Sequence, residues 1–398
     1  MIKGLEHSYL GAVDLLQRLT TTQGILASTL EADNYKRVWA RDSIICGIAG
    51  LLANDDVIVN GLKQSLLTLA KYQADTGAIP SNVLETESAA DVSHGSLVGR
   101  VDANTWFVIG ACLYTLNTRD DDFWQTLRPK VESCRRYLKA LELNGKGWLY
   151  TPLSGNWADE YPVQGYTLYD NMLRLWGESL FLKITNGNSD VLKQLMAKTR
   201  FNFWPKSSSI QGQPYHIKGY EEAASVSHFC SQILPGHYDM RFDASANALA
   251  LLQFKLSSNE KEQLQKYVHD IGIQLSQTLV PAFWPVITKN DWQWQLLQQN
   301  YSFDFKNQPH YFHNGGVWPV WMGWFCLGLA ANEMHDMVAK ITEAMLVFTQ
   351  KEGWDFQEYI NTENFELNGK KQMGFTASGI VFMYHAMEDS SFIKKLYL

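Results

Sequence analysis

The chain has 398 residues, of which 46% are hydrophobic and 19% charged, so it can form a large core and is not mainly disordered. Its formal net charge of −7 at pH 7 argues against nucleic acid and anionic membranes as partners. Aromatic residues make up 13% of the chain, and 14 residues are tryptophan. Because every buried indole N–H needs a hydrogen-bond partner, this abundance favours carbohydrate recognition, in which a sugar packs its C–H face on an aromatic ring.

Apolar residues recur at helical spacing along the whole chain. Leu62, Leu66 and Leu69, for example, fall on one helical face, and Ser257 with Glu260 forms a capping box ahead of another helix. Strand alternation is scarce, and its best candidates are residues 147–151 and 213–218. The pattern predicts eleven or twelve helices, at residues 5–20, 41–53, 57–74, 104–117, 122–142, 166–184, 189–199, 242–255, 259–278, 316–332, 335–351 and 374–388.

The predicted helices differ in the width of their apolar face. Residues 104–117 and 316–332 are apolar nearly all round, whereas residues 57–74 and 335–351 are amphipathic. This contrast predicts two concentric layers, with inner helices buried and outer helices half exposed to water. A double ring of six helix pairs fits the length, so we expect one domain over residues 1–398.

Cysteine usage and the N-terminal sequence indicate a cytoplasmic protein. The five cysteines are scattered and form no CxxC pair, which is typical of a reducing compartment. Glu6 and His7 stand where a signal peptide would have its apolar stretch. Residues 314–332 approach the length of a membrane span but contain Pro319 and four glycines, so we interpret them as a buried helix. We expect no membrane partner and leave homo-oligomerisation open.

Six loops between predicted helices join a tryptophan or tyrosine to a carboxylate, arginine, histidine or asparagine. Carboxylates can accept hydrogen bonds from pairs of sugar hydroxyls, while indoles cover the ring face. An aspartate ahead of a helix is more often an N-cap, and this alternative applies to Asp42, Asp102 and Asp243. The loops are Trp39–Asp42, Gly99–Trp106, Ser154–Tyr166, Gly236–Asp243, His313–Pro319 and Gly353–Tyr359.

Two carboxylates stand out for their local sequence. Asp159 lies in a turn rich in Gly, Trp and Tyr, well before the next predicted helix, so it has less reason to be a cap. Glu358 follows two aromatic residues, a setting that can raise a carboxyl pKa, although it can also be a surface carboxylate beside Asp355. His310 and His313 form an HxxH pair without an adjacent third ligand, which is a weak zinc signal. The sequence has no P-loop, GxGxxG or GxSxG motif.

In their order along the chain, these loops resemble the neutral and alkaline invertases, and more distantly the glucosidase domain of glycogen debranching enzymes and trehalase. The similar positions are collinear from about residue 37 to residue 385, nearly the whole chain. They are Arg41-Asp42-Ser43, Gly99-Arg100-Val101-Asp102, Asp159 followed by Gly165-Tyr166, Phe242-Asp243-Ala244, Phe312-His313-Asn314-Gly315-Gly316-Val317-Trp318-Pro319, Trp354 with Glu358-Tyr359, Gly369-Lys370-Lys371-Gln372 and Thr376-Ala377-Ser378-Gly379.

The resemblance implies an all-α fold, an (α/α)6 barrel of two concentric layers of helices. It also implies an anomer-inverting O-glycoside hydrolase that acts on a small α-linked glycoside or disaccharide, a glucoside or a sucrose-like sugar, without a metal or organic cofactor. The family's general acid falls on Asp159 and its general base on Glu358. The residues expected to bind the substrate are Trp39, Arg41, Asp42, Asp102, Trp106, Trp157, Tyr166, His313, Asn314, Trp318 and Gln372.

The sequence departs from the family beside the expected acid. Where the family has Asp-Arg-Arg-Met, this chain has Asp159-Glu160-Tyr161-Pro162, so Glu160 is a rival for the acid role. As an acid, Asp159 needs a raised pKa, for which Trp157 and Tyr161 would supply apolar cover. We also expect the tryptophans of four loops to line one cavity at one end of the barrel.

Two other functions stay open at this stage. A sugar 2-epimerase can use the same barrel and abstract protons with paired histidines, for which His237, His313 and His385 are available. A carbohydrate-binding protein without catalysis would keep the aromatic loops and show no turnover.

Overall fold

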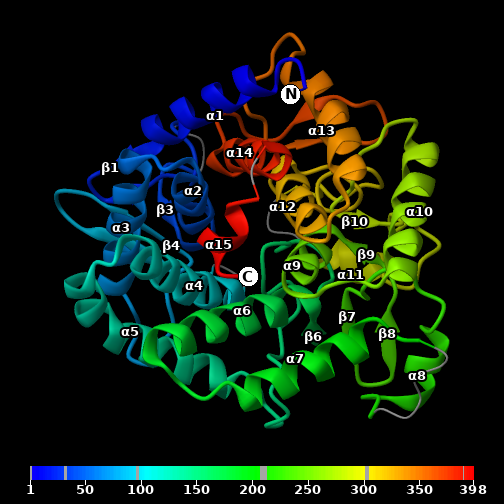
Figure 1. The fold of residues 1–398 in the computed structure, drawn as a ribbon, viewed down its shortest axis with the longest axis horizontal. Helices are drawn as coiled ribbons and strands as arrows, with labels where there is room; N and C mark the ends of the chain where they lie inside the picture. The colour runs from blue at the N-terminus through cyan, green and yellow to red at the C-terminus, as the bar shows by residue number, and fades with distance from the viewer. Residues whose placement is uncertain (1, 31–33, 96–97, 207–212, 301–303, 389) are drawn as a thin grey trace.

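The computed structural model describes residues 2–30, 34–95, 98–206, 213–300, 304–388 and 390–398, and it is mainly helical (Figure 1). The helices in these ranges are α1 (Leu5–Leu19), α2 (Ala40–Ala53), α3 (Asp56–Lys71), α4 (Val101–Thr118), α5 (Asp121–Ala140), α6 (Leu168–Thr185), α7 (Asp190–Phe203), α8 (Ile217–Glu222), α9 (Ala244–Gln253), α10 (Ser258–Leu275), α11 (Trp294–Gln299), α12 (Pro319–Ala331), α13 (His335–Thr349), α14 (Gly374–Glu388) and α15 (Phe392–Leu396).

Short antiparallel strands pair the loops between these helices. In the described ranges they form three two-stranded sheets (β1–β2, β9–β10 and β11–β12) and two three-stranded sheets (β3–β4–β5 and β6–β7–β8). The strands are β1 (Thr20–Thr21), β2 (Gly24–Ile25), β3 (Val38–Trp39), β4 (Asn82–Glu85), β5 (Ala90–Ser93), β6 (Tyr166–Thr167), β7 (Gln232–Leu234), β8 (His237–Asp239), β9 (Phe242–Asp243), β10 (Phe283–Trp284), β11 (Tyr359–Ile360) and β12 (Leu367–Asn368).

All twelve predicted helices are confirmed, with ends within a few residues of the expected ones. The two strand predictions are wrong. Residues 147–151 contribute only the isolated bridge between Thr151 and Gly165, and residues 213–218 lead into α8. The real strands have two to four residues, which is too short to show an alternating pattern.

Six helices pack against one another in a cycle. The contacts run from α2 to α4, α6, α9, α12 and α14, and α14 contacts α2 again. A second set packs on the outside, with α1 on α14, α3 on α2, α5 on α4, α7 on α6 and α13 on α12 (Figure 1). The predicted contrast in burial is confirmed, because every residue of α12 is buried whereas α3 and α13 bury only part of theirs.

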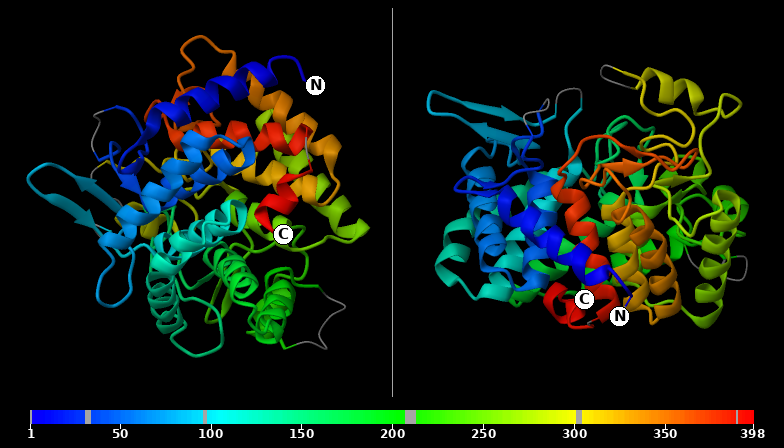
Figure 2. Two further views of the ribbon diagram at one scale, coloured as in Figure 1. Left: turned by 60° about the vertical axis from the view of Figure 1, so that its left-hand side comes forward. Right: turned by 90° about the horizontal axis from the view of Figure 1, so that it is seen from above.

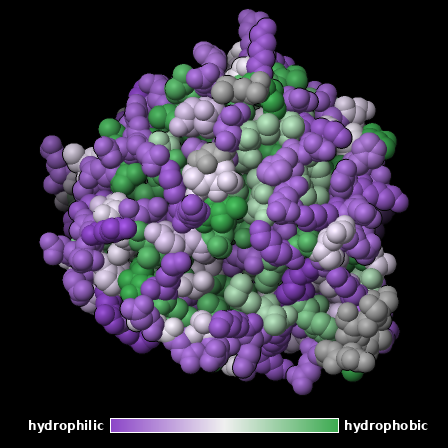
Figure 3. All heavy atoms as spheres, in the orientation of Figure 1, coloured by the Kyte–Doolittle hydropathy of each residue, from purple (hydrophilic) through white to green (hydrophobic). Residues whose placement is uncertain are grey.

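The loops that precede the helices of the cycle gather at one end of the molecule. Strands β3, β6 and β9 lead directly into α2, α6 and α9. In the right-hand view of Figure 2, strands and long loops lie at one end, and both chain termini lie at the other. Figure 3 shows the face that carries α15, where hydrophilic side chains predominate. Among the described helices, none is long and apolar enough to cross a bilayer.

Helices α12 and α14 approach each other through glycines. A Cβ atom added to Gly323 would lie 2.3 Å from the carbonyl oxygen of Gly379, and one added to Gly379 would lie 2.2 Å from that of Pro319. Because these neighbours are backbone atoms, no side-chain rotation can make room. The close packing of two helices of the cycle therefore depends on residues without a side chain.

We expect Gly323→Ala to lower the free energy of unfolding by about 2–3 kcal/mol, the upper range for overpacking, because the helices must move apart. Urea denaturation would measure the change. Gly236→Ala is the matched control, since a Cβ at Gly236 meets nothing within 4 Å. Equal denaturation midpoints for the two variants would contradict the prediction.

Candidate active site

Four aspartates are buried where helices of the cycle begin. Asp42 lies in the first turn of α2, Asp102 in that of α4 and Asp170 in that of α6, while Asp243 immediately precedes α9. Asp243 is an N-cap, because its Oδ1 accepts a hydrogen bond from Ala246 N at 3.0 Å. Asp42 and Asp102 stand inside their helices instead, so capping does not explain their burial.

Arg41 connects the first two of these aspartates. Its Nη1 donates to Asp102 Oδ2 at 3.0 Å, and its Nε lies 3.8 Å from Asp42 Oδ2. Burial raises the pKa of Asp42 to about 6, against the opposing effect of Arg41. The charges of Asp102 and Asp159 also raise this pKa, so the three carboxylates lie close enough to interact.

Asp159 is held by an arginine that the sequence did not single out. Its Oδ2 accepts a hydrogen bond from Arg100 Nη2 at 2.8 Å, and 34% of its side chain is exposed. The same guanidinium donates to the carbonyl oxygen of Ser154 at 3.0 Å. The ring of Tyr161, from which apolar cover is expected, stacks on Phe283 with centroids 4.2 Å apart.

Glu358 is buried, so the surface-carboxylate alternative is wrong. Its Oε1 accepts from the Tyr35 hydroxyl at 2.9 Å, and its Oε2 accepts from Lys370 N at 3.3 Å. Burial raises the pKa of Glu358, while the charge of Lys306 opposes the shift. Gly369 has a φ of +78°, and a Cβ there would lie 2.4 Å from Oε2, so only glycine fits against the carboxylate.

Tyr35 joins the two predicted catalytic carboxylates in one site. Burial and then the charge of Glu358 raise its pKa, and the charges of Asp159 and Asp42 act in the same direction. The charges of three carboxylates from three distant segments therefore act on one hydroxyl.

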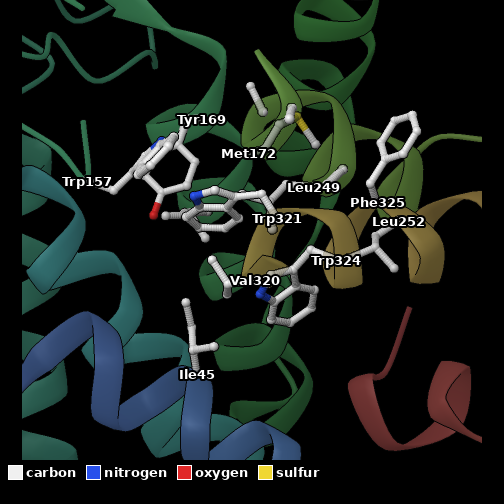
Figure 4. Packing of buried hydrophobic residues seen from close by; sticks show 14 of the residues in the cluster. Ile45, Trp157, Tyr169, Met172, Leu249, Leu252, Val320, Trp321, Trp324 and Phe325 are labelled. Atoms are coloured by element: carbon white, nitrogen blue, oxygen red, sulfur yellow. The ribbon is translucent and has the colours of Figure 1, made fainter. Parts of the chain in front are cut away.

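Aromatic rings from two loops meet beside these carboxylates. The centroid of Trp157 lies 5.4 Å from that of Trp318. It lies 5.0 Å from that of Trp321 in α12 (Figure 4). His313 stacks on Trp318 at 5.2 Å with an interplanar angle of 14°. Burial and nearby cations, including Arg41, hold the pKa of His313 well below 6.5, so its imidazole is neutral at pH 7.

Two residues expected to bind substrate lie away from the site surface. Trp106 is fully buried, and its Nε1 donates to the Tyr169 hydroxyl at 2.9 Å in the core beneath the site. Tyr166 is also buried and packs edge-on against Tyr150 at 5.5 Å. The expectation that one tryptophan from each of four loops lines a common cavity is therefore wrong for Trp106, since a ring with no exposed surface cannot touch a ligand.

The remaining expected ligands lie at the edges of the site. Trp39 is half-buried ahead of α2, and Gln372 accepts a hydrogen bond from the Thr29 hydroxyl. Asn314 is buried, and its amide donates to the carbonyl oxygen of Ile287 at 2.9 Å, which fixes the loop before α12. Asn314 thus holds backbone in place.

Sequence reasoning missed Tyr35, Arg100 and Lys306. Arg100 stood within a stretch similar to the invertases, so attention to every charged residue of that stretch would have found it. Tyr35 and Lys306 lie in polar segments without periodicity, and only the folded chain brings them to Glu358.

The histidines of the epimerase alternative are not brought together. His313 lies in the site, whereas His237 packs on Trp292 with centroids 5.9 Å apart and His385 on Tyr9 at 5.9 Å.

The HxxH pair gives no sign of a metal site. His310 Nδ1 lies 2.9 Å from the Thr362 hydroxyl, and His313 is stacked on Trp318. Within the part of the chain that the structure describes, no group of three His, Cys, Asp or Glu side chains is placed to hold a metal ion.

Known invertases are similar to this chain in sequence. The family model described as alkaline and neutral invertase matches residues 197–389. The probable alkaline/neutral invertase D of Arabidopsis thaliana is 21% identical, over 92% of this chain and 77% of that protein. Cytosolic invertase 1 of Oryza sativa subsp. japonica is 20% identical, over 94% of this chain and 75% of that protein.

Solved glycosidase structures share the fold. The GH63 mannosylglycerate hydrolase of Thermus thermophilus in complex with glucose has a TM-score of 0.66 and 14% identity, covering 94% of this chain and 99% of its own. The glucoamylase of Hormoconis resinae has a TM-score of 0.60 and 10% identity, covering 96% of this chain and 73% of its own. Together, the comparisons confirm the resemblance to the alkaline and neutral invertases and identify the chain as a glycoside hydrolase.

Proposed function

We propose that the protein hydrolyses a small α-linked glycoside or disaccharide, a glucoside or a sucrose-like sugar, with inversion at the anomeric carbon. The observation that carries the proposal is that the Tyr35 hydroxyl donates to Glu358 at 2.9 Å while the charge of Asp159 acts on the same hydroxyl. An inverting glycosidase needs two carboxyl groups roughly 6.5–9.5 Å apart, one to protonate the leaving oxygen and one to activate water. In our proposal Asp159 is the acid and Glu358 the base.

We also propose that residues 1–398 form a single closed (α/α)6 barrel. The cycle of contacts through six helices supports closure, and the second layer packed outside it supports the pairing of inner with outer helices. A barrel of this kind would hold loops from opposite walls at fixed positions around one site.

The other site residues take binding roles in this proposal. Arg41 and Asp42 bind the glycone hydroxyls, because together they offer a donor and an acceptor, and Asp102, whose side chain has no exposed surface, holds Arg41 in place. Trp157 and Trp318 cover the sugar ring, with the neutral His313 beside them. Trp39 and Gln372 lie at the edges, and Trp106, Tyr166 and Asn314 support the loops from below.

Two observations bear on the proposed division of roles. Asp159 is paired with Arg100 at 2.8 Å, whereas burial raises the pKa of Glu358. With Asp159 as acid, substrate binding must displace water from its exposed third and weaken that ion pair. Substitution of each carboxylate separates this assignment from the reverse one.

We expect the first-formed sugar to have the opposite anomeric configuration to the substrate. Proton NMR recorded before mutarotation would show it. Retention would require a carboxylate at nucleophile distance, about 5–5.5 Å from the acid, and would contradict the proposal. A rearranged product with an intact glycosidic bond would indicate the epimerase, and binding without turnover would indicate a carbohydrate-binding protein.

We propose a cytoplasmic location. All five cysteines are buried and free, which supports a reducing compartment.

A further inference from the structure

Asp170 anchors the loop that carries Asp159. Its Oδ2 accepts hydrogen bonds from two threonine hydroxyls at 2.7 and 2.8 Å and from Asn156 Nδ2 at 3.0 Å. The Oδ1 of Asn156 in turn accepts from Ala158 N at 3.1 Å, directly ahead of Asp159. A fully buried carboxyl on α6 thus fixes the backbone beside the proposed acid.

The second oxygen of Asp170 has a different environment. Among the described residues, Asp170 Oδ1 and Asp102 Oδ1 are both buried and have no hydrogen-bond partner. The two carboxyls lie in the first turns of α6 and α4, which pack together. Asp102 uses its other oxygen to accept from Arg41 at 3.0 Å and from the Tyr169 hydroxyl at 3.3 Å.

A single proton shared by the two carboxyls can give both unpaired oxygens a hydrogen bond. Buried acceptors without donors and like charges without a cation between them both cost stability. Burial, followed by the charge of Asp102, raises the pKa of Asp170 from 3.8 to about 7. The charged and titratable groups facing the pair are Arg41 from α2, with Asp42 beyond it, and Tyr169 from α6.

We propose that Asp170 is a protonated positioning residue that donates from Oδ1 to Asp102 Oδ1 and, through Oδ2, fixes the loop of Asp159. The proton forms a hydrogen bond between the two Oδ1 atoms that otherwise have no partner. It also connects the ion pair Arg41–Asp102, at the glycone site, to the loop of the proposed acid. The inference rests on the proposed role of Asp159 as the general acid.

The first test compares thermal stability with pH for wild type and Asp170→Asn, which mimics the protonated side chain. Because the folded-state pKa is raised, the wild-type contribution is complete below 3.8 and is lost as pH rises through about 7. The Tm difference, variant minus wild type, should therefore increase from pH 4 to pH 7 and stay level above. Asp14→Asn, an exposed change on α1, should give a constant difference. A constant difference for Asp170→Asn as well would overturn the shared proton.

The second test separates positioning from general support. Asp170→Leu removes both the donor and the acceptors, so we expect it to hydrolyse a disaccharide at least ten-fold more slowly than Asp170→Asn. A glycosyl fluoride needs little protonation of its leaving group, so its hydrolysis by Asp170→Leu should fall much less. Equal loss on both substrates would mean that Asp170 only supports the fold, and would overturn the positioning role.

A spectroscopic test covers the case in which Asp170→Leu does not fold. Infrared difference spectra across neutral pH should contain one carboxylic acid carbonyl band more in the wild type than in Asp170→Asn, which keeps the bands of Asp42 and Glu358. Identical carbonyl bands in the two proteins would overturn the proposal. The two proposals can fail separately. The variant Asp159→Asn tests whether Asp159 is the acid, and the Tm difference for Asp170→Asn tests whether the proton is shared.

Discussion

Asp159→Asn is expected to reduce hydrolysis of a natural disaccharide by about 10²–10⁴-fold and to leave a glycosyl fluoride far less affected. The amide cannot protonate the leaving oxygen, and an alkoxide leaves slowly without that proton. Fluoride departs with little protonation, so its hydrolysis loses little when the acid is absent. The ratio of kcat/KM values for the two substrates, compared between variant and wild type, measures the effect.

Glu160→Gln is the matched control for this substitution. Glu160 is the neighbouring carboxylate in the same loop and the rival for the acid role, and unlike Asp159 it is buried. If Glu160→Gln rather than Asp159→Asn shows the dependence on the leaving group, Glu160 is the acid. If Asp159→Asn slows the fluoride as severely as the disaccharide, Asp159 does not protonate the leaving group.

Glu358→Gln should slow every substrate to a similar degree, again by about 10²–10⁴-fold. Activation of water is needed whichever group leaves, so a better leaving group cannot compensate. The fluoride and the disaccharide should therefore lose the same factor in kcat. Glu363→Gln, an exposed change in the segment that follows, is the control and should retain activity.

The opposite pair of results would reverse the two roles. If Glu358→Gln depends on the leaving group and Asp159→Asn does not, Glu358 is the acid. Burial, which raises the pKa of Glu358, already favours that arrangement. In either case, a different dependence on the leaving group in the two variants shows that the two carboxylates have different catalytic roles.

The long helices could be predicted from the sequence because burial determines their amino-acid composition. A helix surrounded by others, such as α12, must be apolar all round, and an outer helix such as α5 needs one apolar face. The three helices that were missed, α8, α11 and α15, have five or six residues, which is less than two turns and too short for a periodic pattern. The short strands are pairings between loops and depend on the packed helices beneath them.

The site was predictable where local chemistry was unusual. Asp159 and Glu358 are predicted because aromatic neighbours surround them in the sequence, and their roles stay a prediction. Trp106 shows the limit, because an indole in a helix suits a core as well as a sugar, and its partner Tyr169 is 63 positions away. Asp170 gave no signal, since its importance comes from contacts with Asn156 and Asp102 that appear only on folding.

The common direction of the helices in the cycle has an electrostatic consequence. Each helix N-terminus carries roughly half a positive charge, and α2, α4, α6, α9, α12 and α14 all begin at the loops of the site. Glycoside hydrolysis passes through an oxocarbenium-like, positively charged transition state, which such a field would destabilise. The aspartates buried where α2, α4 and α9 begin lie where a helix macrodipole stabilises an anion, and in their ionised form their negative charge opposes that field at the sugar. The scaffold and the chemistry thus require acidic residues at the same positions.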